Sequence, residues 1–197
     1  IAEGFRSHRN IAIVCFKSLV QNFKVNLMKC GFEMFRLNQH WVFHDFSNTK
    51  DPMIPYAKFL GIPQSVIKIN GGAWFIDFTK PANFDELTGR QQESLNTQIV
   101  ELIKTKYSFY HLDGLTKTKL ETMNKNRVFD NKLVIFDEVH NLTNAMSKAY
   151  PGVRAAGLKQ LIMEATDLKL VFLSGTPIIN NLYEAGQLFN LLRGYIE

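Results

Sequence analysis

An apolar segment that ends in two adjacent carboxylates is the feature that most constrains how this chain folds. Residues 132–140 read Lys-Leu-Val-Ile-Phe-Asp-Glu-Val-His, so four apolar residues precede Asp137 and Glu138. Short continuous apolar runs are typical of strands buried inside a parallel sheet, and such sheets bind ligands beyond the carboxyl ends of their strands. Burying two carboxylates without a task is costly. The segment therefore predicts an α/β fold with this pair at a functional edge of the sheet.

Phosphate chemistry is the task that fits the two carboxylates. One carboxylate holds Mg²⁺ through the water shell of the ion, and the other orients and deprotonates the water that attacks a γ-phosphate. We assign Asp137 to the first role and Glu138 to the second. The alternative is a strand that simply runs out into a solvated turn, which the same residues permit.

A second apolar run also ends in polar residues. Residues 169–173, Lys-Leu-Val-Phe-Leu, are followed by Ser174-Gly-Thr-Pro177. Small hydroxyl residues and a glycine allow close backbone approach and hydrogen bonding, so Ser174 and Thr176 are candidates for sensing the occupancy of the first site. The alternative is a turn in which Thr176 or Asn180 caps the next helix.

Together, the two segments resemble motifs II and III of superfamily 2 helicases and translocases. The wider wording is similar to the helicase-like ATPases of large eukaryotic DNA viruses, among them relatives of poxvirus nucleoside triphosphate phosphohydrolase I and of the poxvirus early transcription factor small subunit. The resemblance covers residues 107–196 well and the preceding region more thinly. The residues that carry it are Phe129-Asp-Asn-Lys132, Asp137-Glu-Val-His-Asn141, Leu173-Ser-Gly-Thr-Pro-Ile-Ile-Asn180 and Leu188-Phe-Asn-Leu-Leu-Arg-Gly-Tyr195.

The resemblance implies a RecA-like parallel sheet flanked by helices, part of the first lobe of a two-lobe motor that closes over ATP. Asp137 and Glu138 contact ATP and Mg²⁺, with Asp137 as the Mg²⁺ ligand through water and Glu138 as the general base. In this family the histidine of the motif, here His140, couples the ATP site to motif III. The coupling residues of that motif are Ser174, Gly175 and Thr176.

The implied function is ATP-driven movement on nucleic acid, with double-stranded DNA as the favoured track. Viral RNA polymerase or transcription machinery is the implied protein partner, in a virion or in infected-cell cytoplasm. The competing hypothesis is a helicase-like scaffold or transcription-factor subunit that binds nucleic acid without hydrolysing ATP. A P-loop kinase without motor function leaves the Ser-Gly-Thr-Pro segment unexplained.

An upstream segment resembles motif Ia, which contacts the nucleic-acid backbone. Residues 11–16 read as a strand, and Lys17 and Ser18 open a helix at its end. A helix N-terminus offers free amide donors for phosphate, to which these two residues add a cation and a hydroxyl. Ser18 as an ordinary helix N-cap is the alternative interpretation.

The chain contains no Gly-x-x-x-x-Gly-Lys-Ser/Thr loop. Residues 1–6 read as the tail of the helix that follows such a loop in the family, and residue 197 falls before the second lobe that the resemblance implies. We therefore expect a lobe truncated at both ends and inactive by itself, because the loop that cradles the phosphates is missing. The function that the resemblance implies is that of the parent protein.

Charge and cysteine usage constrain function only weakly. The net charge of +5 and pI near 9.2 are compatible with nucleic acid without establishing it. Thr116, Lys117 and Lys119 are candidates for phosphate contact, although basic clusters are commonly solvated faces. No apolar run reaches the roughly 20 residues of a membrane span, so no membrane partner is expected. Cys15 and Cys30 suggest reduced core thiols of an intracellular protein.

Alternating strands and helices indicate one α/β domain with an elaboration at 36–90, the least regular part of the chain. Aromatic residues there suggest a small satellite core, with a partner or DNA surface as the alternative. In the helix at 91–104, apolar residues share one face, which we expect to pack on the sheet. Those residues are Leu95, Ile99, Leu102 and Ile103. Expected strands are 11–16, 107–111, 132–137 and 169–173, and the other expected helices are 18–30, 115–124, 155–165 and 180–192.

Overall fold

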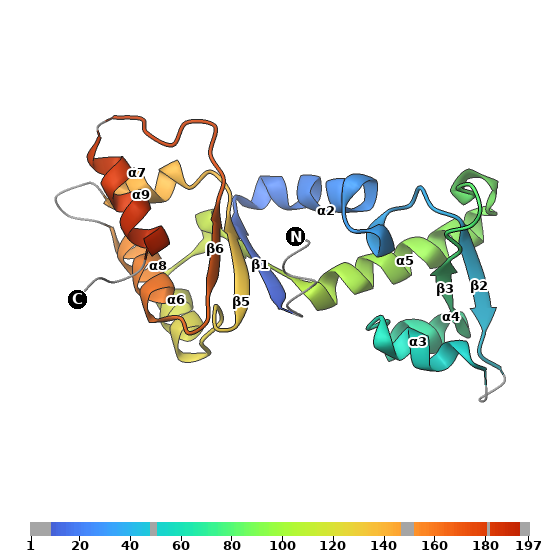
Figure 1. The fold of residues 1–197 in the computed structure, drawn as a ribbon. Helices are drawn as coiled ribbons and strands as arrows, with labels where there is room; N and C mark the ends of the chain where they lie inside the picture. Colours follow the sequence, from blue (N-terminus) through green and yellow to red (C-terminus); the bar gives the residue numbers. More distant parts are fainter. Residues whose placement is uncertain (1–8, 48–50, 147–151, 181, 194–197) are drawn as a thin grey trace. The chain divides into compact units, whose positions relative to one another are not determined.

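The computed structural model describes residues 9–47, 51–146, 152–180 and 182–193, and its ribbon is drawn in Figure 1. The contacts divide the chain into two compact units. The first unit comprises Ile1–Val20 with Ser108–Glu197, and the second unit comprises Gln21–Tyr107. The sequence indicates one domain with an elaboration over 36–90, whereas the structure has a second unit that is wider. The reason is that the helices flanking that region join its core.

The first unit is built on a four-stranded sheet with the order β4-β1-β5-β6. The pairs β1–β5 and β5–β6 are parallel, with Ile13 opposite Ile135 and Ile135 opposite Val171. The α/β fold with a parallel sheet flanked by helices, expected from the sequence, is confirmed. The strands are β4 (Tyr107–His111), β1 (Asn10–Cys15), β5 (Lys132–Phe136) and β6 (Lys169–Phe172).

Burial along the strands follows their place in the sheet. Residues 11–15 of β1 and 133–136 of β5 are buried in succession, as expected for inner strands covered on both faces. β6 stands at the end of the strand order and alternates between exposed and half-buried residues, with Val171 37% exposed. The continuous apolar runs therefore mark the two central strands.

In the described residues of the first unit, four α-helices pack around the core. Helix α6 packs on α8, and α7 packs on both α8 and α9. Aromatic rings cross the core in edge-on pairs, with Phe136 between Phe129 and Phe172. Such pairs add about 0.5–1.5 kcal/mol each beyond their area burial. The helices are α6 (Lys117–Lys125), α7 (His140–Met146), α8 (Val153–Glu164) and α9 (Tyr183–Arg193); α7 has no counterpart among the expected helices.

The second unit has a two-stranded antiparallel sheet of β2 (Trp41–Asp45) and β3 (Gly72–Ile76). Prolines and glycines made this region look irregular, yet they punctuate regular elements. Pro63 is the N-cap of α4, and Gly71 ends that helix in the left-handed region at φ 70°. The helices are α2 (Val20–Cys30), which begins at the unit boundary, α3 (Met53–Phe59), α4 (Gln64–Asn70) and α5 (Gly89–Lys106).

Helix α5 is the longest described element of the second unit. Thr88 and Gln91 form a capping box at its start, which satisfies two backbone donors of the first turn. Its expected apolar face is buried. That face packs within the second unit, where α5 contacts β3 and α4.

The aromatic residues of the second unit build their own core, in agreement with the satellite-core interpretation. Trp41 and Trp74 are buried, and the Trp74 ring centroid lies 5.2 Å from that of Phe43. Cys30 is exposed rather than buried, which corrects the expectation of two core thiols.

No helix in the described segments combines the length and apolarity needed to cross a bilayer. The predicted helix tail at 1–6 and the last residues of the motor resemblance, 194–196, lie outside the described residues.

Candidate functional site

The carboxyl ends of β5 and β6 lie side by side. The Leu173 N–H donates to the Phe136 carbonyl at 2.8 Å, and the Val139 N–H donates to the Leu173 carbonyl at 3.1 Å. These bonds continue the parallel ladder past the last residue of each strand. The segments that follow, Asp-Glu-Val-His and Ser-Gly-Thr-Pro, are therefore brought together at one edge of the sheet.

The ends of β1 and β4 reach the same edge. The Asp137 N–H donates to the Val14 carbonyl at 2.9 Å, which ties the turn after β5 to β1. The Lys17 N–H donates to Asp113 Oδ1 at 3.2 Å, which ties the turn after β1 to the turn after β4. All four strands thus deliver polar residues to one edge, as the rule for parallel sheets predicts.

Glu138 has an unusual backbone. Its φ is 53°, in the left-handed region, which costs an L-residue about 1–2 kcal/mol. Its neighbours hold it there, because the N–H groups of Asp137 and Val139 are both bonded to adjacent strands. Non-glycine residues in this region cluster at functional sites, where surrounding structure compensates the strain.

Asp137 is a half-buried carboxylate beside a second one. Burial raises the pKa of Asp137, the nearby charge of Glu138 raises it further, and the Glu138 N–H that donates to Oδ1 at 3.1 Å lowers it. A desolvated carboxylate next to another anion is stabilised by a cation. In the described part of the chain, no three His, Cys, Asp or Glu side chains gather as a cation site. The pair fits Mg²⁺, which commonly keeps several waters and takes only one or two carboxylates.

His140 connects the two segments. Its Nδ1 lies 2.9 Å from Ser174 Oγ and 3.2 Å from Glu138 Oε2. The Asn141 amide nitrogen, which is only a donor, lies 3.1 Å from Nε2, so Nε2 accepts and the neutral ring carries its proton on Nδ1. The imidazole therefore presents an N–H to both the Glu138 carboxylate and the Ser174 hydroxyl.

The Ser174-Gly-Thr segment is largely exposed. The Thr176 N–H donates to Ser174 Oγ at 3.2 Å, so the hydroxyl that faces His140 also holds the turn. No described heavy atom lies within 4 Å of the position that a Cβ on Gly175 takes. The packing of this chain therefore does not require the close approach that the glycine allows.

Glu184 belongs to this neighbourhood and was missed in the sequence. It is fully buried at the start of α9 and accepts from the Ile179 N–H at 2.7 Å and from the Asn180 side-chain amide at 3.1 Å. The available signal was the four-residue spacing between Asn180 and Glu184, since an acceptor at that distance can bond the chain entering a helix. Among the described residues, the Asn180 side chain thus bonds to Glu184.

Lys17 and Ser18 are both exposed after β1. The N-cap of their short helical turn is Phe16, so Ser18 lies inside the turn and the N-cap interpretation of this residue is wrong. The expectation of a free amide donor at Lys17 is also corrected, because Asp113 accepts that N–H. The Lys17 ammonium and the Ser18 hydroxyl are the groups that stay candidates for binding an anion.

The pKa of Cys15 is affected by the negative charges at this edge of the sheet. Burial raises the pKa of its thiol to about 11, and the charges of Asp137 and Asp113 contribute in the same direction. A thiol held in the neutral form is a poor nucleophile. Cys15 is therefore a core residue that lies close to both carboxylates.

A cavity of about 600 Å³ lies next to Phe16, in the first unit. Its lining includes the apolar side chains of Leu115 and Leu158 and the exposed cations Lys117 and Arg154. Among the other two phosphate candidates, Thr116 caps α6 by accepting the Lys119 N–H, and the Lys119 ammonium donates to the Gly114 carbonyl. Of these three candidates, Lys117 is the one placed at the cavity.

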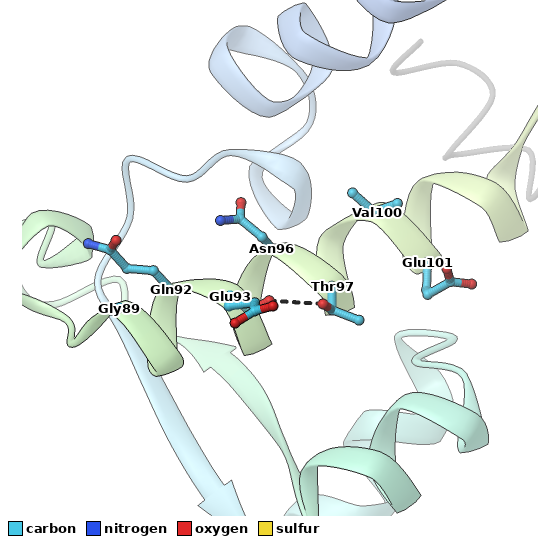
Figure 2. Close-up of a pocket in the computed structure, with 7 residues that line it drawn as sticks. All are labelled: Gly89, Gln92, Glu93, Asn96, Thr97, Val100 and Glu101. Atoms are coloured by element: carbon cyan, nitrogen blue, oxygen red, sulfur yellow. Dashed lines mark hydrogen bonds between the residues drawn. The ribbon is translucent and has the colours of Figure 1, made fainter.

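The second unit has hollows of a different kind. Figure 2 shows one of about 510 Å³ along α5, where the Thr97 hydroxyl donates to the Glu93 carbonyl at 2.9 Å. All seven lining residues belong to that single helix. A further cavity of about 360 Å³ is mainly apolar and includes Trp41 and Trp74. Neither hollow contains a residue singled out for chemistry in the sequence.

No family model matches this chain, and no curated protein matches it significantly. The relationship to superfamily 2 motors therefore stays a prediction that rests on motif wording. The geometry at the sheet edge is independent of that wording.

Proposed function

We propose that the protein containing this chain is an ATP-driven nucleic-acid translocase or helicase of the superfamily 2 type, with double-stranded DNA as its favoured track and transcription machinery as its partner. The observation that carries the proposal is the convergence of Glu138, His140 and Ser174, with Asp137 beside them. Two carboxylates, an imidazole and a hydroxyl at the carboxyl edge of a parallel sheet suit phosphoryl chemistry coupled to a second segment.

Each residue has one task in this proposal. Asp137 holds Mg²⁺ through water, and the ion when bound neutralises charge that develops on the phosphates. Glu138 orients the attacking water and takes its proton. His140, in contact with Glu138 and Ser174, senses the change in charge on the Glu138 carboxylate. Ser174, whose hydroxyl contacts His140, couples that change in charge to the segment that follows β6.

Exposed cations support nucleic acid as the track. Lys17 follows β1, and Lys117 and Arg154 line the cavity that includes the preceding residue, Phe16. Such exposed cations suit a phosphate backbone, which fixes position without reading sequence.

The test is ATP hydrolysis by the complete protein with and without double-stranded DNA. We expect DNA to stimulate hydrolysis, and Glu138→Gln to lower the rate about 10²–10⁴-fold, the usual contribution of a positioned base. Nucleotide and DNA binding should persist in that variant. The matched control is Glu93→Gln, an exposed carboxylate on α5. DNA binding without any turnover contradicts the motor and supports the scaffold.

A further inference from the structure

Glu184 is a buried carboxylate to which the proposed mechanism gives no task. It is fully buried, and the other buried polar side chains of the described chain, Gln98 and Thr143, are uncharged. Within the described residues it forms no ion pair with lysine or arginine. A buried charge without such a partner is costly unless hydrogen bonds compensate it. Its hydrogen bonds therefore explain why it is there.

All the described partners of this carboxylate are donors from one short segment. Oε2 accepts from the Ile179 N–H at 2.7 Å and from the Asn180 N–H at 3.3 Å. Oε1 accepts from the Asn180 N–H at 3.3 Å and from the Asn180 amide group at 3.1 Å. These bonds, that from Ile179 foremost, lower the pKa of Glu184, although burial acts in the opposite direction. The carboxylate is ionised and acts as an acceptor on both oxygens.

The segment that Glu184 holds follows directly on Ser174-Gly-Thr-Pro177. One end of it is fixed by the Ser174 hydroxyl, which lies against His140 in the first turn of α7. The other end is fixed by Glu184 in the first turn of α9. Because α7 and α9 pack on each other, the segment 174–180 is tied at both ends to one pair of helices.

We propose that Glu184 is a positioning residue: by holding Ile179 and Asn180 against α9, it keeps the Ser174 hydroxyl at His140 and links the state of the ATP site to α9. This inference rests on the proposed function. Glu184 touches neither nucleotide nor metal in this scheme, and it acts through the segment that it binds.

The first test is steady-state ATP hydrolysis by the complete protein in the presence of DNA. In Glu184→Gln, an amide N–H₂ faces the Asn180 donors, so the segment loses its anchor. We expect the DNA-stimulated kcat to fall about tenfold or more, comparable to the loss of a hydrogen bond to a charged group, while the KM for ATP stays within about twofold. The control is Glu86→Gln, an exposed carboxylate of the second unit.

A reversal of bond polarity separates positioning from general stability. In the double variant Glu184→Gln with Asn180→Asp, the glutamine N–H₂ donates to the aspartate, and its carbonyl oxygen still accepts from Ile179. We expect kcat to recover at least partly in the double variant, whereas Asn180→Asp alone places two carboxylates together and lowers kcat. Loss of kcat in Glu184→Gln without recovery in the double variant overturns the proposal. Asn180→Ala, which retains both backbone donors, gives a milder second variant if Glu184→Gln does not fold.

The second test needs no hydrolysis. The ring resonances of His140 in the isotope-labelled protein report its hydrogen bond to Ser174, and we expect Glu184→Gln to shift them while those of His40 and His44, in the second unit, stay in place. Unchanged His140 resonances overturn the inference even if the protein is an active motor. Shifted resonances in a protein that hydrolyses no ATP retain the positioning role of Glu184 and reject the motor proposal.

Discussion

His140 Nδ1 lies 2.9 Å from Ser174 Oγ, although 34 residues separate the two in sequence. The contact exists because β5 and β6 are parallel neighbours in register, so the turns that leave them start at the same level. The Glu138 carboxylate also contacts this nitrogen, with Oε2 at 3.2 Å. One imidazole nitrogen thus joins the proposed base to the segment after β6.

Removing the Ser174 hydroxyl should uncouple these segments. Ser174→Ala leaves the Nδ1 atom of His140 with Glu138 alone, and we expect DNA-stimulated ATP hydrolysis by the complete protein to fall about tenfold, the equivalent of about 1.4 kcal/mol for one hydrogen bond. Ser174→Thr keeps the hydroxyl and serves as the control. Equal rates for the alanine variant and the wild type, measured at saturating ATP, contradict the coupling role.

The left-handed backbone of Glu138 leads us to expect that one substitution there raises stability and removes activity. Glycine adopts φ near 53° without penalty, so Glu138→Gly should raise the free energy of unfolding by about 1 kcal/mol and abolish hydrolysis. Glu138→Gln keeps the strain and removes only the charge, which makes it the matched control. Urea unfolding followed by circular dichroism measures the difference. A glycine variant no more stable than the glutamine variant shows that this backbone is not strained.

Gln98 should be a stability residue of the second unit. Its side chain accepts from the Trp74 N–H at 2.9 Å and donates to the Trp74 carbonyl at 2.8 Å in a buried site. Gln98→Ala leaves both backbone groups without partners, so we expect a loss of about 2–4 kcal/mol in the free energy of unfolding. Fluorescence of Trp41 and Trp74 during urea unfolding reports on this unit. Gln64→Ala, an exposed glutamine on α4, is expected to change stability by less than about 0.5 kcal/mol.

The lowered pKa of Asp77 predicts a small loss of folding stability in acid. Bonds from the Thr79 hydroxyl at 2.6 Å and the Thr79 N–H at 3.0 Å, aided by Lys80, lower the pKa of Asp77 from 3.8 to about 2. Because the folded pKa lies below the unfolded one, the stabilisation is present above pH 3.8 and is lost as the pH falls toward 2. Urea midpoints between these pH values should fall less steeply in Asp77→Asn.

The control for that pH series is Asp85→Asn, which removes an exposed carboxylate of the same unit. We expect its midpoints to follow the wild-type slope. If Asp77→Asn and Asp85→Asn give the same slope as the wild type, the turn at Asp77 contributes nothing to acid sensitivity.

Structural features that depend on residues close together in the sequence could be predicted. The strands at 11–16 and 132–137 were visible as apolar runs because burial on both faces leaves no room for polar alternation. The apolar face of α5 was equally visible, since its period comes from the helix itself. Its packing partner was not, because periodicity shows that a face is buried and says nothing about what covers it.

The sequence by itself determined the α/β class, the strand ends at which Asp137, Glu138 and Ser174 stand, and the candidate chemistry there, because apolar runs and polar termini are local properties. Only the tertiary structure decided that the chain forms two units, that Asp113 takes the Lys17 N–H, that Glu138 sits in the left-handed region, and that Glu184 is buried. Each of these depends on hydrogen bonds or packing that local pattern does not encode. Such contacts form only when the strands pair and the helices close over them.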